Sequence, residues 1–132
     1  MQDKIINFKV MGDQRGSLIA LEENHNVPFD VKRVFYIYGT QGNITRGNHS
    51  HYQTKQLLIT INGGCQVTLD DGKGNKETYT LNKPNVGILQ DELVWGSMHN
   101  FSHDCVLMVL ADSYYDDKDY IRDYDTFLKA VK

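Results

Sequence analysis

RGNHSHYQTKQ, residues 46–56, is the stretch that decides how this chain is interpreted. His49 and His51 are separated by one small residue, and Gln56 follows His51 after four others. Side chains at positions i and i+2 of a β-strand project from the same face. A strand here would therefore point both imidazoles the same way. A metal site, an acid–base site and an ordinary polar strand all fit this pattern.

Short apolar runs separated by turn residues fill most of the rest of the chain. In RVFYIY (33–38), alternate residues fall on opposite faces, and in CQVTLDDGKGN (65–75) an alternating run ends in a hairpin-type turn. Turn residues recur about every 8–12 residues, which favours a sandwich or barrel over βαβ units. The sequence therefore predicts an all-β fold.

The C-terminus alone has a helical pattern. In YDDKDYIRDYDTFLKAVK (115–132), apolar residues recur at three- and four-residue steps. Acids gather at the start of this segment and lysines at its end, as a helix dipole favours. We therefore expect a short C-terminal helix with an apolar face formed by Ile121, Tyr124, Leu128 and Val131.

Composition narrows the function classes. The 132 residues predict one domain (1–132), and 40% apolar residues are ordinary for a globular protein. A net charge of −3 without a basic stripe gives no reason to expect nucleic acid. We find no signal-peptide pattern and no apolar run near the ~20 residues of a membrane span. Cys65 and Cys105 lack zinc or redox spacing, so we expect buried free thiols and a cytoplasmic protein.

A wider frame surrounds the histidines. Six residues separate Gly42 from His49, and six separate Gln56 from Gly63. This spacing resembles the first motif of the cupin barrels, with Gln56 at the usual glutamate position. The resemblance implies a cupin-type double-stranded β-helix, a jelly-roll barrel, with the histidines at its mouth.

The second cupin motif normally adds a metal-binding histidine. Counting from Gly87, that position is Met98, and His99 comes one residue later. A shift of one residue on a strand points a side chain to the opposite face. An amide and a thioether replace two of the four ligands, and they are poor donors for zinc, iron or manganese. We therefore expect no metal, although a bulge that turned His99 inward would leave that alternative open.

Without a metal, two imidazoles on one face suit proton transfer, since histidine titrates near neutral pH. The alternative is a pair of polar residues on an exposed strand.

The chain resembles the dTDP-4-oxo-6-deoxyglucose 3,4-ketoisomerases, a group of cupins related to WxcM-type sugar-processing domains. The RGNHSH motif and the closing YDDKDYIRDYD signature are the most distinctive parts. The similarity covers DQRGSLIALEE (13–23), VPFDVKRVFYIY (27–38), ITRGNHSH (44–51), QLLITINGGCQVTLDDG (56–72) and VWGSMHNFSHDCVLMVLADSYYDDKDYIRDYDTF (94–127).

This resemblance implies an enzyme without metal or cofactor that moves a carbonyl from C4 to C3 of a hexose linked to thymidine diphosphate. A base removes the proton next to the C4 ketone, an enediol forms, and a proton returns at C4. The matching histidines imply His49 and His51 as the catalytic residues, with their individual roles open. Candidate substrate-binding residues are Arg46, Tyr36, Arg15, Gln56 and Trp95.

The family forms either a galacto or a gluco product. The DQRG opening with Arg15 resembles the galacto-forming branch, which we favour. Gly96 lacks the larger side chain usual after the tryptophan, which predicts open space beside the sugar ring. The resemblance also implies a homodimer that exchanges N-terminal strands such as IINFKV (5–10), and delivery of the product to an aminotransferase for a surface glycan.

Three alternatives stay open. A cupin that binds a nucleotide sugar without turnover has no need for two titratable groups on one face. A metal-dependent cupin enzyme would lose activity on chelation. A 3,5-epimerase of the same sugar is not excluded by the spacing.

Overall fold

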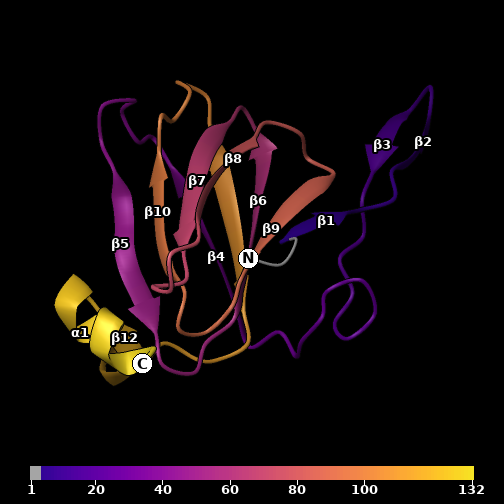
Figure 1. Ribbon diagram of the computed structural model, residues 1–132. Helices are drawn as coiled ribbons and strands as arrows, with labels where there is room; N and C mark the ends of the chain where they lie inside the picture. Colours follow the sequence, from indigo (N-terminus) through magenta and orange to yellow (C-terminus); the bar gives the residue numbers. More distant parts are fainter. Residues whose placement is uncertain (1–3) are drawn as a thin grey trace.

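Two five-stranded antiparallel sheets face each other in the computed structural model, which describes residues 4–132 (Figure 1). The sheet orders are β1-β9-β6-β11-β4 and β12-β5-β10-β7-β8, and a separate hairpin pairs β2 with β3. The all-β cupin prediction is confirmed. The strands are β1 (Ile5–Asn7), β2 (Met11–Asp13), β3 (Gly16–Leu18), β4 (Arg33–Tyr38), β5 (Arg46–His51), β6 (Gln56–Asn62), β7 (Cys65–Asp70), β8 (Lys76–Leu81), β9 (Val86–Gln90), β10 (Trp95–His99), β11 (Val106–Ala111) and β12 (Tyr120–Ile121).

The main core lies between the two sheets. It combines inward residues of the first sheet, such as Leu58 and Leu107, with inward residues of the second, such as Val67 and Leu69. Each is at most 1% exposed, and full burial of such a side chain stabilises a fold by roughly 1.5–3 kcal/mol. Cys65 and Cys105 belong to this core as buried free thiols, as predicted.

A second cluster covers the outer face of the first sheet. Leu57 and Ile59 of β6 pack there against Phe8, Val27 and Phe29, which come from irregular segments. This sheet is therefore apolar on both faces along β6. The apolar run LLI (57–59) matches that burial, since it has no polar alternation.

β5 is distorted beside the histidines. Its pairing with β10 shifts register between Gly96 and Ser97, and Gly47 has a φ of +84°. A Cβ at residue 47 would lie 3.0 Å from the carbonyl oxygen of Gly96, so both the backbone angle and the close approach require glycine. Asn48 follows with a φ of +55°. This bulge ends before His49.

The predicted C-terminal helix is shorter than its apolar pattern suggested. A 3₁₀ turn covers Asp117–Asp119, and Tyr120 and Ile121 form β12 against β5. The helix α1 spans Tyr124–Ala130 and begins after Asp123, whose side chain accepts a hydrogen bond from the Thr126 N–H. Pairing with β5 thus takes two residues of the predicted helix. The residue that α1 buries is Phe127, outside the predicted stripe.

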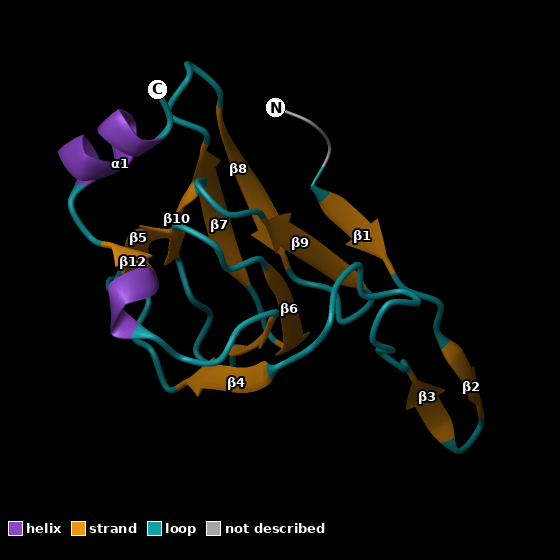
Figure 2. Ribbon diagram, turned by 90° about the horizontal axis from the view of Figure 1, so that it is seen from below, coloured by secondary structure: helices purple, strands orange, loops and turns teal. Residues whose placement is uncertain are grey.

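The N-terminal segment leaves the barrel after its first strand. β1 pairs with β9 of the same chain. Exchange of this strand between subunits stays a prediction. The β2–β3 hairpin projects from the body on the side away from β5, β12 and α1 (Figures 1 and 2). Among residues 4–132, no helix has the length and apolarity that crossing a membrane requires.

Candidate active site

A cavity of about 160 Å³ lies inside the barrel, between β4, β6, β9 and β11 on one side and β5 and β10 on the other. Phe35, Ile37, Leu58 and Val109 give it an apolar wall. The polar or chemically distinctive lining residues are Arg46, His49, Gln56, Gln90, Met98 and Tyr120. This combination of an apolar wall and a few convergent polar groups is typical of a small-molecule site.

His49 and His51 share a face of β5, as the sequence predicts. Their rings lie edge to face, with centroids 5.0 Å apart and planes at 83°. The two positions differ in access. His49 lines the cavity, whereas His51 is 1% exposed and its Nε2 has no hydrogen-bond partner among the described residues.

Burial makes both imidazoles resist protonation. It lowers the pKa of His49, although a hydrogen bond to the Gly47 backbone partly opposes this. It lowers the pKa of His51 to about 4, and the neighbouring His49 adds to the effect. Both rings are therefore neutral at pH 7, which is the state in which an imidazole can accept a proton.

Tyr120 is one of the residues that the sequence analysis missed. β12 pairs Tyr120 with His51, and its ring lies 4.5 Å from the His51 centroid and 5.1 Å from that of His49. Tyr120 also lines the cavity. Its position in the closing YDDKDYIRDYD signature was the available signal, but a helix prediction there gave no reason to bring it to β5.

Charged groups surround the buried end of the pair. The Arg33 guanidinium carbon lies 5.2 Å from the Phe35 ring centroid, and the Arg33 Nε is buried without a hydrogen-bond partner among the described residues. Arg122 lies 4.4 Å over the Tyr120 ring. Both arginines lower the pKa of His51, while the carboxylate of Asp119 raises it. These residues also escaped the sequence analysis, because Arg33 lies far along the chain from Asp119 and Arg122.

The two residues at the usual cupin metal-ligand positions, Gln56 and Met98, form part of the cavity wall. Gln56 is 5% exposed and Met98 is 8% exposed, and both line the cavity beside His49. His99 points the other way, where its Nε2 lies 2.9 Å from the Thr68 hydroxyl. The bulge in β5 and β10 does not turn His99 inward. Within residues 4–132, no three His, Cys, Asp or Glu side chains form a group that could hold a metal ion.

Gln90 occupies the space that we expected beside Gly96. A Cβ at residue 96 would lie 2.5 Å from the Gln90 Nε2, which donates a hydrogen bond to the Val94 carbonyl at 3.0 Å. The predicted open space is therefore wrong. Glycine at position 96 makes room for the amide of Gln90, which is 4% exposed and lines the cavity.

Two predicted substrate contacts lie outside this cavity. Tyr36 is 64% exposed on the outer face of β4, because alternation directs Phe35 and Ile37 inward. Trp95 lies on the outer face of β10, with its ring 5.2 Å from Tyr124 and 5.6 Å from Phe127. Trp95 therefore packs against α1 and does not line this cavity. The sequence pattern defined both pairs of faces but not which one was interior.

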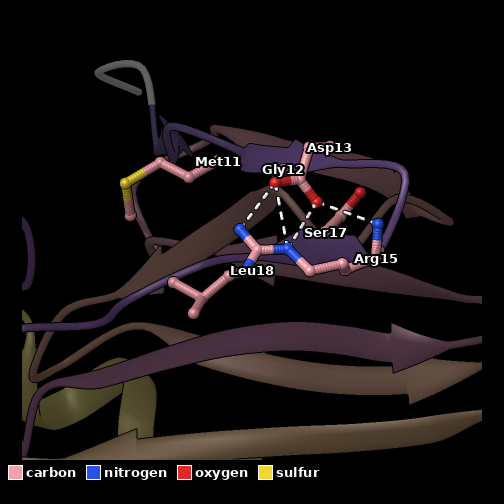
Figure 3. Close-up of a pocket in the computed structure, with 7 residues that line it drawn as sticks. Met11, Gly12, Asp13, Arg15, Ser17 and Leu18 are labelled. Carbon is pink, nitrogen blue, oxygen red and sulfur yellow. Dashed lines mark hydrogen bonds and ion pairs between the residues drawn. The ribbon is translucent and has the colours of Figure 1, made fainter.

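Of the two predicted substrate-binding arginines, one lines the cavity and the other lies outside it. Arg46, at the start of β5, lines the cavity. Arg15 lies at the tip of the β2–β3 hairpin, where its side chain turns back to pair with Asp13 at 2.6 Å (Figure 3). Its side chain is 87% exposed. Within one chain, Arg15 does not reach the histidines.

Comparisons with known proteins show the family of this chain. The family model described as FdtA, WxcM-like, C-terminal matches residues 1–132. A TDP-4-oxo-6-deoxy-α-D-glucose-3,4-oxoisomerase of Aneurinibacillus thermoaerophilus is 53% identical over 131 residues, which are 99% of this chain and 94% of that protein.

Solved structures are similar along nearly the whole chain. The TDP-quinovose 3,4-ketoisomerase WlaRB of Campylobacter jejuni is 48% identical, with a TM-score of 0.92 and coverage of 96% of each chain. A 3,4-ketoisomerase of Helicobacter canadensis is 45% identical, with a TM-score of 0.93, over 97% of this chain and 96% of that one.

Proposed function

The chain belongs to the FdtA, WxcM-like family and is an isomerase, and we propose that it converts TDP-4-oxo-6-deoxyglucose to a TDP-3-oxo-6-deoxyhexose. The observation that carries the proposal is the pair of neutral imidazoles, one lining the cavity and one buried behind it. The 53% identical relative is named for a 3,4-oxoisomerase acting on that sugar nucleotide.

We assign the carbon base to His49. Its ring lines the cavity, and its lowered pKa keeps it neutral and able to take the proton from C3, next to the C4 ketone. The electrons of the C3–H bond form the C3–C4 double bond of an enediol, while the C4 oxygen takes a proton. The C3 hydroxyl then loses its proton, the ketone forms at C3, and a proton returns at C4. No redox partner is needed, because the substrate's own carbonyl accepts the electrons.

His51 serves this transfer as the second imidazole. Its ring centroid is 5.0 Å from that of His49, and its buried Nε2 has no other hydrogen-bond partner among the described residues. We propose that it shares the proton taken up by His49. Arg46 lines the same cavity and supplies positive charge for the developing enolate.

We propose that the reaction needs no metal. Gln56 and Met98 stand where the cupin frame has a glutamate and a histidine, and neither is a good donor for zinc, iron or manganese. Activity that persists after exhaustive chelation supports this; activity restored by one added divalent metal contradicts it.

We propose the galacto configuration for the product, on the resemblance of the DQRG opening with Arg15. Proton NMR of the purified protein with TDP-4-oxo-6-deoxyglucose tests both reaction and configuration. A new 3-keto product establishes the isomerase, and the coupling at H4 separates galacto from gluco. If the substrate stays unchanged while TDP binds, the protein is a nucleotide-sugar-binding cupin instead.

We propose a homodimer that uses the exposed face of β4. Val34, Tyr36 and Tyr38 are 55%, 64% and 71% exposed on this edge strand, an unusual apolar grouping for a free surface. The β2–β3 hairpin that carries Arg15 projects from the body on the side away from β5 and β12 (Figure 1), so we expect Arg15 to reach a substrate only from a partner subunit. Light scattering of wild type and Tyr38→Glu tests the interface, with Thr78→Glu on the other sheet as control. The cytoplasmic location and the aminotransferase that follows stay predictions from sequence.

A further inference from the structure

Asp119 joins two segments that meet at the histidine pair. Its carboxylate accepts hydrogen bonds from the Gln53 N–H at 2.9 Å and from the Thr54 hydroxyl. Its backbone carbonyl accepts from the Tyr52 N–H at 3.0 Å. Residues 52–54 follow His51 directly along the chain. One side chain and its own backbone therefore fix the end of the catalytic strand.

The next residue along the chain is Tyr120, which packs on both imidazoles. β12 has two residues, and their pairing partners on β5 are His51 and Ser50. So short a strand has few backbone hydrogen bonds of its own to hold it in place. The bonds of Asp119 to residues 52–54 thus determine where the Tyr120 ring lies.

Most of the surroundings of His51 disfavour its protonated form, and Asp119 has the opposite effect. Burial, His49 on the same strand, Arg33 of β4 and Arg122 after β12 all disfavour the imidazolium. The Tyr120 ring packs against the same imidazole. Asp119 supplies negative charge, and its effect on His51 is favourable to protonation.

We propose that Asp119 is a positioning residue for proton transfer: it holds Tyr120 against the two imidazoles and allows His51 to take up a proton during turnover. Proton uptake by His51 during turnover rests on the proposed function. The effect of Asp119 on the position of Tyr120 and on the imidazole pKa values does not, and it is measured without substrate.

The test compares Asp119→Asn with Asp116→Asn, the same change in the same turn. Asp116 caps the 3₁₀ turn by accepting from the Lys118 N–H, an acceptor role that asparagine keeps. Imidazole carbon and proton shifts of His49 and His51, followed against pH in labelled protein, give the pKa of each ring. The shifts also report whether Tyr120 still lies over them. Steady-state kinetics give kcat and KM.

Asp119→Asn is expected to lower the pKa of His51, to shift both imidazole resonances and to reduce kcat roughly tenfold or more with little change in KM. Asp116→Asn is expected to match wild type in all three. Thr54→Val, which removes a hydrogen bond but keeps the charge, is expected to leave the pKa of His51 above that of Asp119→Asn.

Unchanged imidazole pKa values in Asp119→Asn would overturn the proposal, as would equal effects of Asp119→Asn and Asp116→Asn. If Asp119→Asn does not fold, Asp119→Ser keeps a hydrogen-bond acceptor without the charge and carries the same expectations. A wild type that turns over no sugar nucleotide would refute the proposed function, while the imidazole measurements would still decide the role of Asp119.

Discussion

His49 and His51 lie 5.0 Å apart on one strand, yet one lines the cavity and the other is 1% exposed. Two chemically identical side chains therefore have different access to a substrate. The difference arises because Tyr120 packs on both rings and β12 covers the end of β5.

Replacing either histidine should separate catalysis from binding. His49→Gln is expected to reduce kcat by about 100-fold or more, because a glutamine cannot accept a proton from carbon. TDP affinity, measured by calorimetry, should stay near that of wild type. His99→Gln is the matched control, since His99 faces outward toward Thr68. Parallel loss of TDP binding and turnover in His49→Gln would argue for a cupin that binds a nucleotide sugar without catalysis.

Activity should fall on the acidic side of neutrality. The proposed catalytic pair, His49 and His51, must be neutral to act as a base, and burial lowers the pKa of both rings below the usual 6.5. We expect kcat/KM to be constant near pH 7 and to fall with an apparent pKa below 6.5 that belongs to the coupled pair. A fall that begins above pH 7 on acidification would contradict neutral, buried imidazoles.

The buried His51 should make stability depend on pH. Its pKa is about 4 in the folded protein and near 6.5 when unfolded, so below pH 6.5 the unfolded chain binds more protons. The stabilising contribution is present above pH 6.5 and is lost as pH falls to about 4. From this shift, the free energy of unfolding of the wild type should fall by on the order of 3 kcal/mol across that pH range because of His51. The free energy of unfolding of His51→Gln, from denaturant titrations at each pH, should fall less over the same range. An equal fall in both proteins would contradict the lowered pKa of His51.

Gly96 and Gln90 should be energetically coupled. A methyl group at residue 96 would meet the Gln90 amide at 2.5 Å, so Gly96→Ala is expected to destabilise the fold by about 1–3 kcal/mol. Shortening the neighbour relieves that collision. The double variant with Gln90→Ala should therefore be more stable than the sum of the two single changes predicts, by about 0.5–3 kcal/mol. Additive losses would show that the side chains do not meet.

The two cysteines should be unreactive in the folded protein. Burial raises the pKa of Cys65 to about 12 and also raises that of Cys105, so neither forms a thiolate near pH 8. Reaction with a disulfide reagent is expected to be at least about 100-fold slower in native than in denatured protein. Cys105→Ser leaves one thiol and should show the same protection. Rapid native labelling would contradict the burial of this pair.

The local pattern predicted which residues share a face of each strand, but it did not predict which face points into the barrel. Alternation in RVFYIY defined two sets of residues, and the structure places Phe35 and Ile37 inside and Tyr36 outside. The same choice sent Met98 inward and His99 and Trp95 outward. Which set is interior depends on the partner strands, and a period of two is the same for both sets.

By itself the sequence determined the strands, the shared face of His49 and His51, the loss of the cupin metal ligands at Gln56 and Met98, and the family. The strands and the shared face follow from short-range periodicity, which is a local property of a chain. The cupin positions of Gln56 and Met98 and the family rest on the resemblance of the motifs to known proteins. The tertiary structure alone decided that Tyr120 lies over the imidazoles, that Asp119 holds residues 52–54, and that Gln90 fills the space at Gly96. Each of these contacts joins segments far apart in sequence, or depends on which face of a strand the barrel encloses. A helical pattern in residues 115–132 even pointed away from β12, because pairing with β5 outweighed local helix propensity there.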